Sequence, residues 1–243
     1  MDQEILLAPL DVSPAYQAVV DRLSASVALG VLLPGDRLPS ERALADRLGV
    51  SRVTVREGLR VLQGAGVIST RGGSSGWVVT NDVGSDGRPL IASDRSGANL
   101  EQVFEFRRTV EGAAARLAAQ RRTSADVQHL KEHVEALRVS QNVGDFRRAD
   151  SAFHLAIAAA AGNPLILRAV VEARTAAFTV VDARPYEVRK APSISDHQRI
   201  VAAIARGDAI AAEKTMTEHL ERARDEIVAV LADRPGQAEA GWS

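Results

Sequence analysis

The 243-residue sequence contains no cysteine. A disulfide framework, a thiolate metal site and a cysteine nucleophile are therefore excluded, and any bound metal must be held by nitrogen and oxygen ligands. The sequence also lacks an apolar run of the roughly 18 residues that cross a bilayer. Its acidic first residues lack the basic and then apolar layout of a secretory signal. We expect a soluble, cytoplasmic protein without a membrane partner.

A strong net charge is absent as well. The formal net charge is −1, which gives no global indication of a nucleic-acid partner, so charge has to be examined segment by segment. Apolar residues make up 46% of the chain, which is enough for a real core. The length allows two ordinary domains or one large one.

The first part of the chain predicts a helix-turn-helix followed by a hairpin. Apolar residues recur at helical spacing over 15–29. Ser40 precedes a short helix over 41–48, and Ser51 precedes a second helix over about 52–63, each in the position of an N-cap. A Gly-containing turn joins these two helices. Strand, Gly-rich turn and strand follow over 67–80, and a hairpin directly after a helix-turn-helix is a wing.

The rest of the chain predicts helices. After a linker rich in Gly, Asp, Ser and Pro, helical patterns cover 100–121, 123–140, 145–161, 164–182, 195–206 and 208–231. Prolines at 185 and 192 are expected to bracket a connection. The sequence therefore predicts a mainly α protein: a winged helix-turn-helix domain over 1–80, a linker over 81–98, an antiparallel all-helical bundle over 99–234 and a disordered tail over 235–243. Bundles build ligand and metal sites in their cores.

Local charge favours DNA binding by the first domain. Between residues 40 and 71, six arginines face three acidic residues, a local charge of +3. The surplus lies at the helix starts and the tip of the hairpin, where phosphate and groove contacts are made. On charge alone, a solvated arginine-rich helix is an equal alternative.

The motif resolves this choice. The segments Leu38-Pro39-Ser40-Glu41-Arg42, Gly49-Val50-Ser51-Arg52-Val53-Thr54-Val55-Arg56 and Arg71-Gly72-Gly73 closely resemble the GntR family of bacterial regulators, and the match covers about residues 15–80. The resemblance implies that Arg42 reaches the DNA backbone. It also implies that Ser51, Arg52, Thr54 and Arg56 lie on the recognition helix in the major groove, and that Arg71 and Gly72 approach the minor groove from the wing. Val53 stands where many relatives carry a polar residue.

All five histidines lie in the helical part of the chain. Asp150 and His154 are four residues apart and so share one helix face. His197 is expected in the first turn of the fifth predicted helix and His219 on the sixth. One carboxylate and three imidazoles from three helices would form a nitrogen and oxygen site for a divalent transition metal. A single histidine is more often an ordinary residue, and His129 and His133 are interpreted as solvated.

The order and spacing of these residues resemble the FCD effector domain, which defines the FadR subfamily of GntR regulators, over about residues 100–232. The resemblance rests on Glu105 to Glu111, Asp150-x-x-Phe153-His154, Gly162-Asn163-Pro164 and the His197 and His219 segments. It implies that Asp150, His154, His197 and His219 are the metal ligands and that Arg107 pairs with a carboxylate effector. A structural ion pair is the alternative for Arg107, and Glu111 is interpreted as structural. The fatty-acyl-responsive branch of the family lacks these metal ligands, so the presence of all four argues against a sensor of acyl-CoA. Zinc is the preferred occupant, with nickel or manganese as alternatives.

These patterns predict a homodimeric, ligand-controlled DNA-binding regulator, a repressor in preference to an activator, that binds a pseudo-palindromic operator and a small organic acid. Two alternatives remain: a sensor of metal alone, and a metal-dependent enzyme with a DNA-binding appendage. Against the enzyme, Glu218 is the only obvious spare base and no phosphate-binding glycine loop is present. We therefore predict that the protein is not an enzyme.

Overall fold

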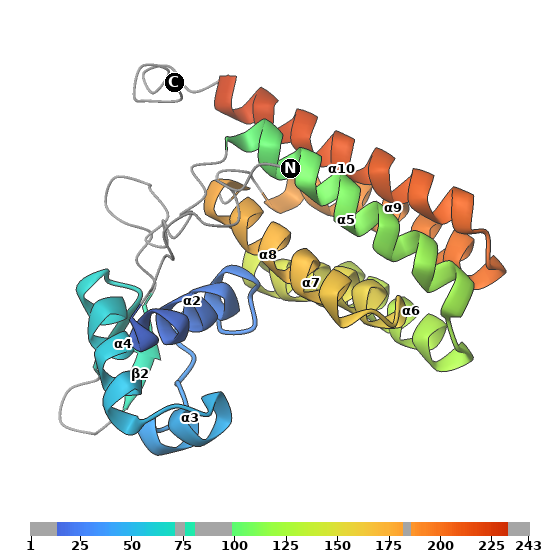
Figure 1. Cartoon of the computed structure of the whole chain (residues 1–243). Helices are drawn as coiled ribbons and strands as arrows, with labels where there is room; N and C mark the ends of the chain where they lie inside the picture. Colours follow the sequence, from blue (N-terminus) through green and yellow to red (C-terminus); the bar gives the residue numbers. More distant parts are fainter. Residues whose placement is uncertain (1–13, 71–75, 81–98, 182–185, 233–243) are drawn as a thin grey trace, which may run out of the picture. The chain divides into compact units, whose positions relative to one another are not determined.

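The computed structural model describes residues 14–70, 76–80, 99–181 and 186–232, which include both kinds of domain that the sequence predicts (Figure 1). The chain divides into two compact units. The first comprises Met1–Ser24 and Pro34–Leu90, and the second comprises Ala25–Leu33 and Ile91–Ser243. The predicted linker, over 81–98, and the predicted tail, over 235–243, lie outside the described residues.

The first unit contains the predicted helix-turn-helix. Its helices are α2 (Ala15–Ala28, whose last residues group with the second unit), α3 (Glu41–Leu48) and α4 (Arg52–Gly64). Both predicted N-caps are confirmed: the backbone N–H of Ala43 donates to Ser40 Oγ (3.2 Å), and that of Thr54 donates to Ser51 Oγ (3.0 Å). Each bond satisfies one of the free N–H groups at a helix start. A small apolar core holds the unit together, formed by Val19, Val20, Leu23, Leu44, Val55, Leu59, Leu62, Ile68 and Val79.

Two glycines fix the geometry of this unit. Gly49 ends α3 with φ of 66°, a left-handed conformation that glycine adopts without strain, and so turns the chain into α4. Gly58 lies where α4 meets α2: a Cβ added there would be 3.0 Å from the side chain of Val19 and 3.1 Å from the carbonyl oxygen of Tyr16. The close approach of the two helices therefore depends on the missing side chain.

The hairpin follows α4 as predicted. Strands β1 (Ile68–Thr70) and β2 (Trp77–Val79) pair antiparallel with Ile68 opposite Val79 and Thr70 opposite Trp77. Ile68 and Val79 point into the core of the unit. The turn between the strands, residues 71–75, lies outside the described residues.

The second unit contains a helical bundle formed by α5 (Leu100–Arg121), α6 (Ser124–Val139), α7 (Val143–Ala160), α8 (Pro164–Val181), α9 (Tyr186–Arg206) and α10 (Ala209–Ala232). Helices α5 and α10 run side by side along most of their length (Figure 1). Small residues on α5 make this close packing possible: Ala114, Ala115, Ala118 and Ala119 are buried, and a Cβ on Gly112 would lie 3.3 Å from Thr217 Oγ1. Larger side chains fill the centre of the bundle, among them Phe104, Phe153, Leu130, Ile157, Ile200, Ile204, Met216 and Leu220.

Helix α9 differs from the prediction. The sequence predicts that Pro185 and Pro192 bracket a connection and that Ser195 caps a helix; instead, α9 begins at Tyr186 and continues through Pro192. A proline in a helix removes one backbone hydrogen bond and kinks the chain, but it does not require the helix to end. Buried residues beyond the proline, including Asp196 and Ile200, anchor the helix in the bundle. His197 consequently lies well inside α9 rather than in its first turn.

Within the described part of the chain, no helix combines the length and the apolarity that a membrane crossing requires.

Candidate metal centre and DNA-binding surface

The structure brings together the four residues predicted to bind metal. Asp150 and His154 lie on α7, His197 on α9 and His219 on α10, and one potential ligand atom from each lies within 4.8 Å of the others. The Nε2 atom of His197 is 3.3 Å from Nε2 of His154 and 3.4 Å from Oδ1 of Asp150. The three histidine residues are at most 8% exposed. Three helices thus direct one oxygen and three nitrogens to one buried point.

The other ring nitrogen of each histidine faces an oxygen acceptor. Nδ1 of His197 donates to the carbonyl oxygen of Ser193 (2.5 Å), Nδ1 of His219 lies 3.3 Å from Asp196 Oδ2, and Nδ1 of His154 lies 2.5 Å from Glu111 Oε2. Carbonyl and carboxylate oxygens accept hydrogen bonds, so each Nδ1 carries the proton. In a neutral ring this leaves the lone pair on Nε2, the atom directed at the cluster. Histidine ligands of metal sites are oriented by such outer partners.

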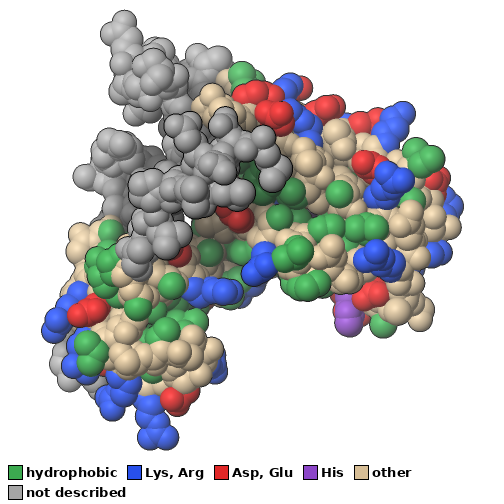
Figure 2. All heavy atoms as spheres, viewed as in Figure 1, with side chains coloured by type: hydrophobic (Ala, Val, Ile, Leu, Met, Phe, Trp, Pro, Cys, Tyr) green, Lys and Arg blue, Asp and Glu red, His purple; other side chains and the backbone are tan. Residues whose placement is uncertain are grey.

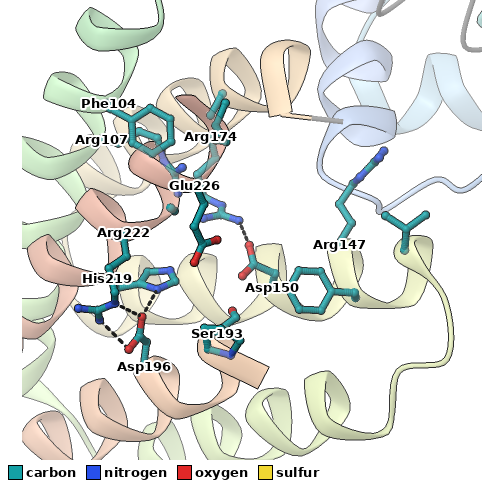
Figure 3. Close-up of a pocket in the computed structure, with 16 residues that line it drawn as sticks. Phe104, Arg107, Arg147, Asp150, Arg174, Ser193, Asp196, His219, Arg222 and Glu226 are labelled. Atoms are coloured by element: carbon teal, nitrogen blue, oxygen red, sulfur yellow. Dashed lines mark hydrogen bonds and ion pairs between the residues drawn. The ribbon is translucent and has the colours of Figure 1, made fainter. Parts of the chain in front are cut away.

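The candidate oxygen ligand also has an outer partner. Arg174 Nη2 on α8 donates to Asp150 Oδ2 at 2.6 Å (Figure 3). The other carboxylate oxygen, Oδ1, lies 3.4 Å from His197 Nε2 and 4.0 Å from His154 Nε2. Burial by itself would raise the pKa of Asp150, but Arg174 and the three histidines together outweigh burial and hold that pKa well below its usual range. Asp150 is therefore an anion at neutral pH.

Burial sets the protonation of two of the imidazoles. Burial, assisted by the charge of Arg174, lowers the pKa of His154 to about 4 even though Glu111 opposes the shift. Burial also lowers the pKa of His197 well below its usual value, and repulsion from His219 adds to this effect. Both rings are therefore neutral near pH 7, the form in which imidazole binds metal.

Sequence reasoning missed the role of Glu111, a fully buried acid on α5 interpreted as structural. Its carboxylate contacts Arg107 Nε (2.7 Å), His154 Nδ1 (2.5 Å) and Arg174 Nη1 (3.4 Å). Burial alone would raise the pKa of Glu111, but the charge of Arg107, the contact with His154 and the charge of Arg174 together hold it well below its usual range. The i,i+4 spacing of Arg107 and Glu111 signals their pairing, whereas the contact with His154, 43 residues further along, becomes visible only in the fold.

A pocket opens beside this cluster, lined by residues from α5, α7, α8, α9 and α10 (Figure 3). Asp150 and His219 belong to its wall, as do Arg107 and Arg174. Arg107, the residue predicted to bind an effector, is 7% exposed, pairs with Glu111 through Nε and has its guanidinium carbon 5.0 Å from the centre of the Phe104 ring. The structural ion pair considered for Arg107 is therefore present, and the side chain also faces the pocket.

The two predicted solvated histidines behave differently from each other. His129 is exposed, as expected, but His133 is half-buried. Burial lowers the pKa of His133, and repulsion from His129 adds to this, while Glu132 opposes it. The interpretation of His133 as solvated is thus corrected: it faces partly inward on α6.

In the first unit, most of the described residues predicted to contact DNA are exposed. Arg42 on α3 is exposed, as are Arg52 and Arg56 on α4, and Figure 2 shows basic side chains gathered over these two helices. Ser51 and Thr54 are engaged locally, with their hydroxyl oxygens 2.8 Å apart at the start of α4. Val53 is 64% exposed beside Arg52, so an apolar residue projects into solvent from the first turn of α4.

Arg56 has a protein partner that the sequence did not indicate. Its Nη2 and Nε atoms donate to Glu41 Oε2 at 2.9 and 3.1 Å, and this bond raises the pKa of Arg56. The contact joins α4 to the start of α3 on the exposed surface. Arg71 and Gly72, predicted to form the wing tip, lie outside the described residues.

Comparison with known families agrees with this architecture. Residues 15–79 match the model of the bacterial regulatory proteins of the gntR family, and residues 102–222 match the FCD domain. The chain is a member of the GntR family. It is 31% identical to the transcriptional regulator LutR of Bacillus subtilis over 81% of this chain and 93% of that protein. It is 32% identical to the Exu regulon transcriptional regulator of Escherichia coli over 86% and 83% of the two chains.

A solved structure shares the fold of this GntR-family protein. The Escherichia coli protein McbR/YncC superposes with a TM-score of 0.56 at 20% sequence identity, covering 90% of this chain and 99% of that one. The family assignment makes this protein a DNA-binding transcription regulator with an effector-binding FCD domain, and not an enzyme. The predicted family and fold class are thus confirmed.

Proposed function

We propose that this GntR regulator belongs to the FadR subfamily and acts as a homodimeric repressor whose operator affinity is controlled by a small carboxylate bound beside a divalent metal. In this proposal Asp150, His154, His197 and His219 hold the ion, with zinc preferred over nickel or manganese. Arg107 pairs with the effector carboxylate. On the DNA side, Arg42, Ser51, Arg52, Thr54 and Arg56 contact the operator from α3 and α4, with Arg71 and Gly72 at the wing.

One observation carries the metal proposal. Nε2 of His154 and Nε2 of His197 are 3.3 Å apart, and the Nδ1 atom of each ring lies 2.5 Å from an oxygen that can only accept a hydrogen bond, which places the ring proton on Nδ1. Two lone pairs and the Asp150 carboxylate therefore face one another in a buried space, an arrangement that is repulsive unless a cation lies among them. The donor set of three imidazoles and a carboxylate suits a divalent transition metal.

Different residues around the cluster would hold the metal ion, orient its ligands and contact the effector carboxylate. A divalent ion held there would offer a Lewis-acidic position to a carboxylate oxygen of the effector. Glu111 and Asp196 hold two imidazoles in the required orientation, and Arg174 neutralises Asp150. Arg107 lines the same pocket and supplies a second positive contact for the effector.

The DNA side of the proposal is tested with a duplex selected from a random-sequence library by the full chain. Arg52→Ala should lose most of its affinity for the selected duplex in a fluorescence anisotropy titration, because Arg52 is exposed at the start of α4. Arg168→Ala, an exposed arginine on α8, is the matched control and should bind as wild type. Equal affinity of wild type and Arg52→Ala would contradict the assignment.

The effector side is tested with the same duplex, zinc-loaded protein and a panel of carboxylates. A member of the panel should lower the operator affinity of wild type, and the coupling should amount to about 1–3 kcal/mol. The double variant His154→Ala/His219→Ala should still bind the duplex but lose the response, whereas His129→Ala/His133→Ala should keep it. Release of DNA by zinc alone would instead support a metal-only sensor, and an unchanged response in the first double variant would contradict the site.

A further inference from the structure

The side chain of Val53 lies on the side of α4 that faces away from the core of the first unit. The buried residues of this helix form one stripe along it: Val55, Gly58, Leu59 and Leu62. Successive residues of an α-helix are about 100° apart around the axis, so Val53 lies almost opposite the middle of this stripe, whereas Arg52 lies to one side. The exposure agrees with this position, since Val53 is 64% exposed and Val55 is 0% exposed.

The way in which a helix-turn-helix binds DNA gives this position its significance. The second helix of the motif enters the major groove, and its N-terminal residues contact the base edges. In this GntR-family protein α4 is the second helix, and Val53 belongs to its first turn. A side chain on the outer side of that turn lies deepest in the groove, whereas side chains nearer the buried stripe lie closer to the phosphates. Val53 would therefore face the base edges when α4 is docked.

The chemistry of the major groove determines which base such a side chain favours. The base edges present hydrogen-bond donors and acceptors there, and the 5-methyl group of thymine is the apolar group that distinguishes one base from the other three. The isopropyl side chain of Val53 can neither donate nor accept a hydrogen bond. Contact with a thymine methyl removes apolar surface of both partners from water, whereas contact with a polar edge would leave that edge without a hydrogen-bond partner.

The first turn of α4 has a defined geometry before DNA binds. Ser51 Oγ accepts a hydrogen bond from the backbone N–H of Thr54 at 3.0 Å and lies 2.8 Å from Thr54 Oγ1. These bonds hold the start of the helix in place. Valine has one strongly preferred side-chain rotamer in a helix, so the two methyl groups of Val53 are fixed relative to the helix axis. Contact with a base therefore costs little conformational entropy.

We propose that Val53 reads a thymine of the operator through contact with its 5-methyl group, which makes Val53 a specificity-determining residue of this regulator. This inference rests on the proposed contact of the start of α4 with the operator and adds to it a base preference. It requires a thymine in the operator whose contribution to binding comes from its methyl group and not from its hydrogen-bonding groups.

Replacement of thymine by deoxyuridine tests this, because deoxyuridine lacks only the 5-methyl group. Each thymine of the duplex selected by the full chain is replaced in turn, and binding is measured by fluorescence anisotropy. At least one replacement should weaken binding by wild type about three- to tenfold, since burial of one methyl-sized group changes an affinity by a factor of about four. Val53→Ala should lose most of this difference. Alanine has the higher helix propensity, so the variant keeps α4 intact.

Val61→Ala is the matched control. Val61 is another exposed valine of α4, 43% exposed and about two turns further along the helix. This variant should respond to deoxyuridine as wild type does. A wild-type affinity that no replacement changes, or a full response retained in Val53→Ala, would overturn the inference. If Arg52→Ala loses affinity in either case, the contact of α4 with the operator still holds and only the role of Val53 fails; if Arg52→Ala also binds as wild type, the contact itself fails.

Discussion

Nδ1 of His154 lies 2.5 Å from Oε2 of Glu111, and both side chains are almost completely buried. The same carboxylate pairs with Arg107 and reaches Arg174, the partner of Asp150. One acid on α5 therefore joins two candidate metal ligands to the arginine proposed to hold the effector. The proposed effector pocket and the candidate metal centre therefore share this buried network of ion pairs.

Replacement of this acid should affect metal affinity and stability together. Glu111→Gln should lower zinc affinity by roughly 10- to 100-fold, since it removes the outer partner that orients His154. It should also lower the free energy of unfolding by about 3–5 kcal/mol, because Arg107 and Arg174 would be left buried without their shared anion. Zinc competition titrations and urea unfolding of the apo protein measure the two effects. Zinc affinity equal to that of wild type would show that Glu111 has only a structural role.

The ion pair between Arg56 and Glu41 should restrain DNA binding. Glu41→Gln removes the acidic partner, so it should raise the affinity for the selected duplex several-fold and steepen its salt dependence as Arg56 becomes available to phosphate or base. Anisotropy titrations at several salt concentrations test this. In an Arg56→Ala background the gain from Glu41→Gln should largely disappear. A gain of the same size in both backgrounds would mean that only the general charge of the surface had changed.

Close packing of α2 and α4 makes Gly58 sensitive to substitution. Gly58→Ala should destabilise the winged domain by about 1–2 kcal/mol, because the added methyl would press on Val19 and on the backbone at Tyr16, which outweighs the better helix propensity of alanine. Gly64→Ala is the matched control, since a Cβ there meets nothing within 4 Å. We expect it to be neutral or slightly stabilising. Thermal unfolding of the two variants compares them directly, and equal stability would refute the packing argument.

The half-buried His133 predicts a pH dependence of stability. Its pKa is lowered in the folded state because burial and then His129 disfavour the charged ring. The unfolded state therefore binds a proton more readily than the folded state. The free energy of unfolding should be highest above the pKa of the unfolded histidine, about 6.5, and should fall as the pH drops from there through the lower pKa of the folded state. His133→Gln should accordingly lose less stability than wild type between pH 7.5 and pH 5.5. His129→Gln, exposed one turn earlier, should show a smaller effect in the same urea titrations, and identical slopes for all three proteins would contradict the argument.

Local signals predicted most of the first unit. Ser40 and Ser51 have short hydroxyl side chains directly before amphipathic runs, and Gly49 supplies the turn between them, so caps, helices and hairpin follow from neighbouring residues. The four candidate metal ligands were also identified in advance, although spacing within one helix links only Asp150 and His154. Their convergence with His197 and His219 depended on resemblance to a known domain.

What the sequence did not reveal depends on contacts between distant helices. Arg174 and Asp196 complete the surroundings of the candidate ligands from α8 and α9, yet neither residue stands in a distinctive local pattern. The continuation of α9 through Pro192 was missed for a related reason: packing of the helix in the bundle outweighs the local preference of proline to end it. Long-range packing, rather than composition, determines both features.

The central claim is that the buried cluster on α7, α9 and α10 holds one divalent metal ion. Its most direct test is the zinc content per chain, measured by inductively coupled plasma mass spectrometry after loading and gel filtration of wild type and of His154→Ala/His219→Ala. The account predicts one equivalent of zinc in wild type, as in His129→Ala/His133→Ala, and almost none in the cluster variant. Equal zinc content in wild type and the cluster variant would contradict it.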